Sequence, residues 1–222
     1  MKLRNMIDTF DRANFAATGT SDNKNTTGQG LVFTSFGPGA AATWPRIENG
    51  KLKEAYPGNT DANEWDVDLT FTPGRVELTW SYDSFTSPVD NTVPWLAPIS
   101  SSLDANFDVY VHPLFYRDSM IFSVKYRRLD CTTTATITGL LIDHAYATPL
   151  SAGVQYSASV EYNNNTVIMT DPFGATATVS HPQLANSNGR FMNLQINYHD
   201  ADGVGPLNVH RFACYPKKRN SV

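Results

Sequence analysis

The sequence has little cysteine, little charge and no long apolar run. Its two cysteines, Cys131 and Cys214, are too few for a disulfide framework, and two reduced thiols are favoured over a single bridge. No apolar stretch is long enough for a membrane span, and we expect no secretory signal at the N-terminus. Charged residues make up 17% of the chain and the net charge is −4, which argues against nucleic acid as a partner.

Helical periodicity is also missing, because apolar residues nowhere recur at 3.6 spacing over ten or more positions. Apolar and polar residues alternate instead, and 14 glycines and 13 prolines supply turns. Asn49-Gly50, between Ile47 and Leu52, predicts a hairpin. Alternation and turns together predict an all-β chain, an antiparallel β-sandwich of the jelly-roll type with essentially no helix. The expected strands cover residues 31–36, 65–71, 75–82, 106–111, 119–126, 135–143, 154–162, 166–171, 175–180, 191–198 and 207–215.

Three segments fall outside this alternation, and we interpret residues 1–222 as one domain that carries them. Residues 18–30 are polar and glycine-rich, which predicts a flexible loop or arm. Residues 84–102 contain three prolines and predict a long Pro-rich loop, a kind of connection that often carries function. Residues 216–222 form a basic tail.

The stretch "NEWDVDLTF" places three carboxylates, Glu64, Asp66 and Asp68, at alternate positions of an expected strand. It resembles the Glu-x-Asp-x-Glu strand of sandwich-fold β-glucanases of the laminarinase and lichenase type. Asp68 is one methylene shorter than the final Glu of that pattern. Retaining glycosidases need carboxyl groups about 5 to 5.5 Å apart, whereas Glu64 and Asp68 would be roughly 13 Å apart along a regular backbone. We therefore predict a solvated strand face, no catalytic residue and no enzyme.

Few other residues suggest a binding site. The five histidines have no metal-ligand spacing, and "YHDADG" at residues 198–203 is only a fragment of a calcium loop, so we expect no metal and no cofactor. Aromatic side chains that could stack on sugar rings are the remaining candidates for a glycan-binding site. These candidates are Trp95, Trp44, Tyr56 and Tyr82.

Three segments carry a family resemblance. "DTFDRAN" at residues 8–14 and "TWPRIENGKLKE" at residues 43–54 resemble the first strands of concanavalin A-like and laminin-G-like jelly-roll domains. Residues 150–191 are similar to the back half of these domains, especially as they occur in bacteriophage minor tail proteins. The resemblance frames nearly the whole chain and implies a lectin-like sandwich.

The resemblance implies a structural bacteriophage virion protein, as a minor tail, fibre or capsid-decoration component located in the virion. Its expected partners are other virion proteins, further copies of itself and host cell-surface carbohydrate. Two alternatives stay open. One is a stand-alone carbohydrate-binding module, and the other is a β-glucanase-type glycoside hydrolase that uses Glu64 and Asp68.

Overall fold

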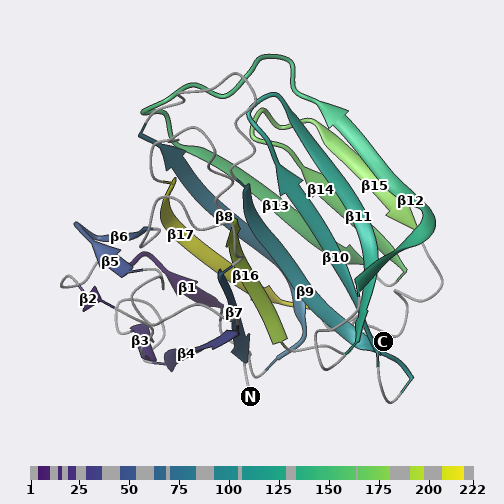
Figure 1. The fold of residues 1–222 in the computed structure, drawn as a ribbon, viewed down its shortest axis with the longest axis horizontal. Coiled ribbons are helices and arrows are strands. Elements are labelled where there is room, and N and C mark those ends of the chain that lie inside the picture. The colour runs from purple at the N-terminus through teal and green to yellow at the C-terminus, as the bar shows by residue number, and fades with distance from the viewer. Residues whose placement is uncertain are drawn as a thin grey trace.

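The computed structural model describes the chain in thirteen segments and forms two antiparallel sheets without a helix among them (Figure 1). This arrangement confirms the predicted all-β sandwich. No described segment is a helix that could span a membrane. The described segments are residues 5–10, 15–16, 20–23, 29–36, 46–53, 63–68, 71–83, 93–104, 107–128, 134–163, 165–180, 191–197 and 207–217.

One sheet has nine strands in the order β15-β14-β13-β8-β17-β6-β5-β2, and β1 also pairs with β17. Strands β8 and β17 lie at its centre and share a long antiparallel ladder. The strands of the nine-stranded sheet are β1 (Met6–Asp8), β2 (Phe15–Ala16), β5 (Arg46–Glu48), β6 (Lys51–Lys53), β8 (Pro73–Tyr82), β13 (Tyr156–Asn163), β14 (Thr166–Thr170), β15 (Thr176–Ser180) and β17 (Leu207–Pro216).

The other sheet has eight strands in the order β12-β11-β10-β9-β16-β7-β4-β3. Consecutive strands of the chain often lie in different sheets, so that β7, β8 and β9 alternate between the eight-stranded and the nine-stranded sheet. The strands of the eight-stranded sheet are β3 (Thr20–Asn23), β4 (Gln29–Phe36), β7 (Asn63–Asp68), β9 (Val93–Asp104), β10 (Phe107–Phe115), β11 (Ser119–Arg128), β12 (Thr134–Ala145) and β16 (Phe191–Asn197).

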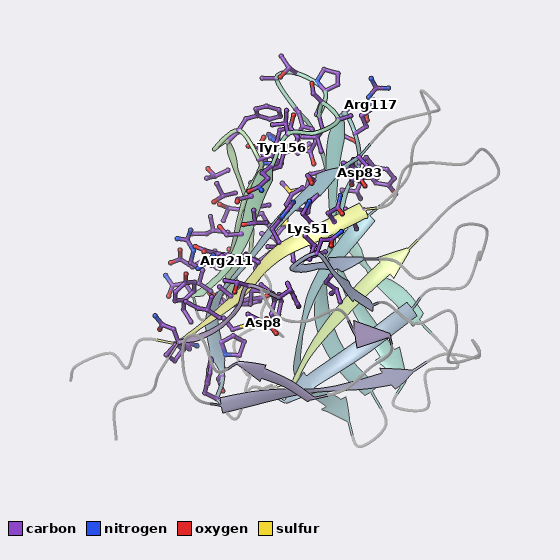
Figure 2. The ribbon with its side chains drawn as sticks, turned by 90° about the vertical axis from the view of Figure 1, so that its left-hand side faces the viewer. Asp8, Lys51, Asp83, Arg117, Tyr156 and Arg211 are labelled. Carbon is purple, nitrogen blue, oxygen red and sulfur yellow. The ribbon has the colours of Figure 1, made fainter. Side chains whose placement is uncertain are left out.

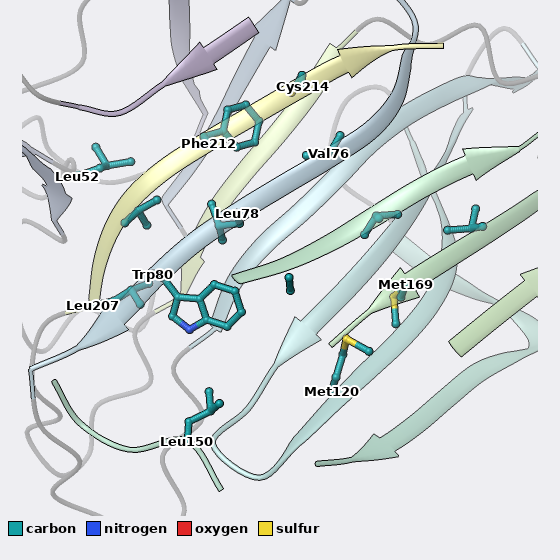
Figure 3. Close-up of a cluster of buried hydrophobic side chains, with 14 of the residues drawn as sticks. Leu52, Val76, Leu78, Trp80, Met120, Leu150, Met169, Leu207, Phe212 and Cys214 are labelled. Atoms are coloured by element: carbon teal, nitrogen blue, oxygen red, sulfur yellow. The ribbon is translucent and has the colours of Figure 1, made fainter. Parts of the chain in front are cut away.

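The core lies against the inner face of the nine-stranded sheet (Figure 3). Alternation along β8 buries Val76, Leu78 and Trp80, as predicted, because successive side chains of a strand point to opposite faces. The eight-stranded sheet contributes Met120 from β11. The other buried members include Leu52, Leu150, Val160, Val167, Met169, Leu207, Val209 and Phe212.

The predicted Asn49-Gly50 hairpin is confirmed. It joins β5 to β6, and its two central residues have φ values of 53° and 71°. Positive φ at both central positions is typical of the two-residue turn whose twist matches that of paired strands, and Asn and Gly adopt it at low cost.

Part of the predicted flexible arm at residues 18–30 is instead a hairpin at the edge of the eight-stranded sheet. Thr20–Asn23 pairs with the first half of Gln29–Phe36. A ladder of backbone hydrogen bonds does not require apolar side chains, which is why a polar segment with little to bury still forms strands. Residues 24–28 lie outside the described residues.

The predicted Pro-rich loop at residues 84–102 is also a strand over much of its length, because β9 begins at Val93. Its first half, residues 93–98, pairs with β16, and its second half, residues 99–104, pairs with β10. Pro94 and Pro98 therefore stand where the strand has a ladder on one side only, and a missing N–H is tolerated at such positions. Of the predicted basic tail, Pro216 belongs to β17, and residues 218–222 lie outside the described residues.

Candidate active site

The three carboxylates of the sequence pattern lie on β7, inside the eight-stranded sheet. Its neighbours are β16 and β4, and its pairing with both runs without a register shift. Since alternate positions of a strand share one face of the sheet, Glu64, Asp66 and Asp68 fall on the same face. The strand is thus regular, and no bulge brings the three positions closer together.

The opposite face of the same strands carries an apolar pattern. Trp65 and Val67 of β7 are paired with Leu194 and Met192 of β16. Leu194 is paired in turn with Leu96 of β9. A sheet with one apolar face and one polar face packs the apolar face on the core. The sequence pattern therefore assigns the carboxylate face to the outside of the sandwich.

Backbone spacing limits what the three carboxylates can do. At about 3.3 Å per residue, neighbouring acidic positions are roughly 6.6 Å apart and Glu64 and Asp68 roughly 13 Å apart. Glycosidases hold their two carboxyl groups about 5 to 5.5 Å apart for retention and about 6.5 to 9.5 Å apart for inversion. The backbone separation of Glu64 and Asp68 exceeds both ranges, so the length of these two side chains determines the distance between the reacting groups.

The register also brings distant residues beside the carboxylates. Glu64 lies opposite Gln195 of β16 and Phe36 of β4, and Gln195 lies opposite Trp95 of β9. Residues directly opposite each other in an antiparallel pair share a face. With strands about 4.8 Å apart, the backbone of Trp95 lies roughly 10 Å from that of Glu64. An amide and two aromatic residues thus share a row with Glu64.

A second row runs parallel to the first. Asp66 lies opposite Asn193 of β16 and Thr34 of β4, and Asn193 lies opposite Ala97 of β9. Sequence reasoning identified Trp95 and the carboxylates but missed Phe36, Gln195 and Asn193. No local sequence signal could have found these three, because the register between strands distant in the chain decides which residues become neighbours.

Of the four predicted glycan-binding residues, the described part of the chain contains Trp95 and Tyr82, and Trp95 is the one of these two that falls on the carboxylate face. Tyr82 is in the core with 1% of its surface exposed, so its ring is not accessible to a sugar. Trp44 and Tyr56 lie outside the described residues, as does the calcium-loop fragment at residues 198–203. No group of acidic, histidine or cysteine side chains in the described segments could hold a metal ion, and the one described cysteine, Cys214, is a buried free thiol.

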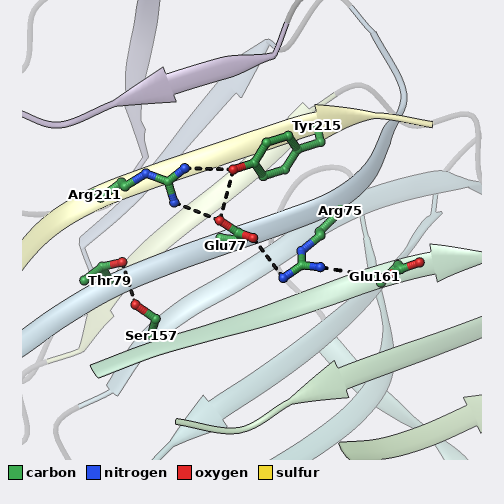
Figure 4. Close-up of polar contacts among 7 residues, drawn as sticks. All are labelled: Arg75, Glu77, Thr79, Ser157, Glu161, Arg211 and Tyr215. Atoms are coloured by element: carbon green, nitrogen blue, oxygen red, sulfur yellow. Dashed lines mark hydrogen bonds and ion pairs between the residues drawn. The ribbon is translucent and has the colours of Figure 1, made fainter. Parts of the chain in front are cut away.

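A second polar cluster lies on the nine-stranded sheet, and the charged groups in it are paired with one another (Figure 4). Glu77 of β8 accepts hydrogen bonds from Arg211 at 2.8 Å and from the hydroxyl of Tyr215 at 3.1 Å, and its other oxygen lies 2.9 Å from Arg75. Burial raises the pKa of Glu77, but the hydrogen bonds from Arg211 and Tyr215 and the charge of Arg75 outweigh it and hold this pKa below 4.5. This cluster is a structural ion network.

A third polar group surrounds His210, an extra residue in β17 where its register against β8 shifts. Its Nε2 lies 2.8 Å from the hydroxyl of Ser81. Its Nδ1 lies 3.5 Å from the amide nitrogen of Gln155, which can only donate. Both ring nitrogens of His210 thus have polar neighbours, and the ring tautomer decides which of the two nitrogens donates. Burial and the charge of Lys51 lower the pKa of His210. The charge of Asp83 acts on this pKa in the opposite direction, and Figure 2 labels both Lys51 and Asp83.

No family model matches this sequence, and no curated protein matches it. Solved structures do match. The β-glucanase of Bacillus licheniformis matches with a TM-score of 0.60 and 10% identity over 97% of this chain and 99% of that chain. SCLam, a non-specific endo-β-1,3(4)-glucanase from family GH16, matches with a TM-score of 0.55 and 12% identity over 96% and 90% of the two chains.

LamA of Zobellia galactanivorans, solved in complex with laminaritriose and laminaritetraose, matches with a TM-score of 0.55 and 12% identity over 94% of this chain and 97% of that chain. At such identities the likeness concerns the fold. It confirms the predicted concanavalin A-like jelly roll, and it extends over nearly the full length of both partners in each comparison.

The same comparisons correct the functional prediction. The interpretation as a structural bacteriophage virion protein and the prediction that the chain is not an enzyme are contradicted, because these three solved structures, which match 94–97% of the chain, are glucanases. The error has a physical reason. Segments such as "DTFDRAN" mark the strands and turns of a jelly roll, and the same fold serves proteins of unrelated function.

Proposed function

We propose that this protein is a glycoside hydrolase that cleaves β-glucan, with Glu64 and Asp68 as its two reacting carboxyl groups. One observation supports this assignment above all. A Glu-x-Asp-x-Asp strand lies between β16 and β4 within the eight-stranded sheet, in a chain that matches glucanases along its length. Hydrolysis of a glycosidic bond needs such a pair of carboxyl groups on one surface.

The chemistry assigns distinct tasks to the pair. One carboxyl group protonates the leaving oxygen, and the other acts as a carboxylate on the anomeric carbon or on a water molecule. Asp66 lies between Glu64 and Asp68 on the same face, so its negative charge favours the protonated form of either neighbour. A carboxyl group kept protonated near neutral pH is the general acid that the reaction requires.

The neighbouring rows supply groups suited to sugar. Trp95 and Phe36 lie on opposite sides of Glu64, two strands and one strand away. Aromatic rings stack on the apolar faces of sugars, and amides such as Gln195 hydrogen-bond to hydroxyl groups. We infer that a glucan chain crosses the strands of this sheet and passes over Glu64 between the two aromatic residues.

The test is release of reducing sugar from a panel of laminarin, lichenan and cellulose. We expect the wild type to cleave at least one polymer, and Glu64→Gln to lower kcat/KM by about a thousandfold or more, since the reacting carboxylate is lost. Glu77→Gln on the other sheet is the matched control and should retain activity. Binding without cleavage across the panel, or full activity in Glu64→Gln, would overturn the proposal.

The same variants can assign the two tasks. Azide replaces a missing catalytic carboxylate as a small nucleophile, so Glu64→Ala and Asp68→Ala should respond differently to it. In a retaining enzyme, azide should restore activity to the variant that lacks the nucleophile, and the product should be a glycosyl azide of inverted configuration. The residue replaced in that variant would then be the nucleophile.

A further inference from the structure

The outermost strand of the nine-stranded sheet, β15, lacks the features that usually keep a sheet edge from pairing. In the described part of the chain it pairs with β14 alone, over five residues and without a register shift. Its sequence, Thr-Ala-Thr-Val-Ser, contains no charge and no proline. An edge strand presents a row of backbone N–H and C=O groups, which proteins commonly protect with charged side chains, proline or a bulge. Strand β15 is therefore suited to pairing with a further strand.

The edge of the other sheet lies on the same side of the sandwich. Strand β12 is the outermost strand of the eight-stranded sheet, and it contacts β15 (Figure 1). Residues 134–142 of β12 are also uncharged, although a register shift interrupts its pairing with β11. Phe173, in the turn that leads into β15, is 42% exposed. Exposed apolar groups beside two neutral edges are typical of a surface that binds another protein.

The pairing that β15 already makes shows what kind of partner it accepts. Ser180 and Thr166 of β14 are hydrogen-bonded across the ladder, with 3.0 Å between their hydroxyl oxygens. On the core side of the same two strands, Val179 lies opposite Val167. The partner strand thus presents hydroxyl groups on one face and apolar groups on the other.

A second copy of β15 meets this requirement. An antiparallel pair of β15 strands about a two-fold axis at Thr178 places this residue opposite its own copy. Thr176 is then opposite Ser180 on the solvent side, and Ala177 is opposite Val179 on the core side. Hydroxyl groups meet hydroxyl groups, apolar groups meet apolar groups, and no like charges are brought together. A two-fold axis of this kind gives a closed dimer in which both copies use the same surface.

We propose that two copies of this chain associate through β15, as an antiparallel pair that joins their nine-stranded sheets into one. The inference does not depend on the proposed hydrolase function. Strand β7, which carries the three carboxylates, belongs to the other sheet and is five strand spacings from β12, roughly 24 Å at about 4.8 Å per strand. The carboxylate face of each copy therefore lies away from the contact, and two linked faces bind a polymer more tightly than one.

Sedimentation velocity without any substrate tests the association. A pair of short strands buries less area than a standard interface, so the expected Kd lies between about 1 μM and about 1 mM. Over this range of concentration the wild type should shift from the mass of one chain toward that of two. Thr178→Lys places like charges opposite each other at the axis and should weaken association by about tenfold or more. Ser157→Lys adds the same charge at an exposed position of β13, two strands from the edge, and should associate as the wild type does.

Thr178→Cys tests the register of the pair. Directly opposite residues of an antiparallel pair have Cβ atoms about 4.5 to 5.5 Å apart, which a small adjustment brings within reach of a disulfide. Mild oxidation by a copper complex should therefore crosslink Thr178→Cys into a covalent dimer. The wild type controls for its own thiols, Cys131 and Cys214, and Ser157→Cys controls for an exposed thiol away from the edge. Both controls should crosslink far less.

Every outcome supports or overturns the inference. A wild type that stays monomeric over the whole range of concentration would overturn it. A dimer that Thr178→Lys leaves intact, or that Ser157→Lys weakens equally, would show that the contact lies elsewhere, as would a dimer that Thr178→Cys does not crosslink. Association through β15 in a protein that cleaves no glucan would support this inference while the hydrolase proposal fails, so the two failures are distinguishable.

Discussion

Glu77 shows how a polar residue stabilises the outer face of a sheet. Its side chain is 22% exposed and contacts two arginines and a tyrosine hydroxyl. Glu161 makes a weaker contact, 4.0 Å from Arg75, and its side chain is 52% exposed. The two residues have the same chemistry and differ in burial and in the number of partners, so they form a matched pair for measuring what the network contributes.

We expect Glu77→Gln to lower the free energy of unfolding by about 1 kcal/mol at neutral pH, which corresponds to a loss of charge-assisted hydrogen bonds. The folded-state pKa of Glu77 lies below the ordinary 4.5, so its contribution is present above pH 4.5 and is lost as pH falls through the lowered pKa. Urea unfolding between pH 7 and pH 3 measures this. The difference in the free energy of unfolding between the wild type and Glu77→Gln should disappear toward pH 3. Glu161→Gln should have nearly the same free energy of unfolding as the wild type at every pH.

Asp68 is the residue at which the three carboxylates of β7 depart from the glucanase pattern. The regular register of β7 leaves the distance between Glu64 and Asp68 to their side chains. Replacement by Asp68→Glu lengthens one of the two by a methylene and should bring the reacting groups closer. We expect kcat for β-glucan to rise about tenfold, since errors of about an ångström in the placement of a reacting group cost that much or more.

Asp68→Asn is the matched control for Asp68→Glu, because it preserves length and removes the carboxyl group. It should lower kcat by about a thousandfold or more, with little change in KM. If Asp68→Glu were slower than wild type, the shorter side chain would be part of a wider, inverting geometry, and analysis of the product anomer by proton NMR would show it.

At the scale of elements, local sequence predicts turns and alternation better than it predicts pairing. The hairpin at Asn49-Gly50 and the buried face of β8 follow from neighbouring residues alone, and both are confirmed. Strand β9 was missed because Pro94 and Pro98 argue against a central strand. Its pairing passes from one partner to the other in mid-strand, which depends on the positions of β10 and β16. The same dependence hid Gln195 as the neighbour of Glu64.

The turn between β14 and β15 is fixed to the opposite sheet by one aspartate. Asp171 is buried, and its Oδ1 accepts hydrogen bonds from the backbone N–H groups of Phe173 and Ala175, both at 2.8 Å. Its Oδ2 lies 3.1 Å from Nε2 of His144 at the end of β12. One carboxylate thus holds a turn of the nine-stranded sheet and a strand of the eight-stranded sheet together.

We expect Asp171→Ala to cost about 2 to 3 kcal/mol, because it leaves two backbone donors without their acceptor and removes the contact to His144. Asp171→Asn should cost less, since its carbonyl oxygen can still accept from both donors. Thermal unfolding would rank the variants, with a shift of about 2 to 4 °C for each kcal/mol in a chain of this size. Equal losses in both variants would show that the charge, and not the turn, carries the stability.

At the scale of the whole molecule, the fold was predictable and the function was not. Alternation, turn residues and the jelly-roll resemblance extend along the chain, so they define the sandwich. The sequence alone favoured a virion component over a hydrolase, because Asp68 is one methylene shorter than the final Glu of the glucanase pattern, and the match to solved glucanases contradicts that choice. Because one fold serves many functions, the test of the function is made on particular side chains and not on the fold.

The β7 face that we propose as catalytic should stabilise the molecule less than the ion network around Glu77 does. The three carboxylates on β7 are like charges roughly 6.6 Å apart at successive positions of one face, whereas Glu77 is paired with Arg75 and Arg211. Functional sites commonly retain such unfavourable arrangements at some cost in stability. Neutralising a carboxylate on β7 should therefore leave stability unchanged or raise it, whereas neutralising Glu77 on the other sheet should lower stability.

Glu64→Gln and Asp66→Asn should leave the melting temperature unchanged or raise it by about 1 to 3 °C, since each relieves repulsion among like charges on one face of β7, while β-glucan hydrolysis falls. Glu77→Gln should lower the melting temperature and preserve hydrolysis. Calorimetry and reducing-sugar release on the same preparations measure both quantities, and the expected gain in melting temperature should shrink at high salt. A loss of stability in Glu64→Gln as large as that in Glu77→Gln would indicate that the β7 carboxylates are structural, and loss of hydrolysis in that variant would then be no evidence for a catalytic role.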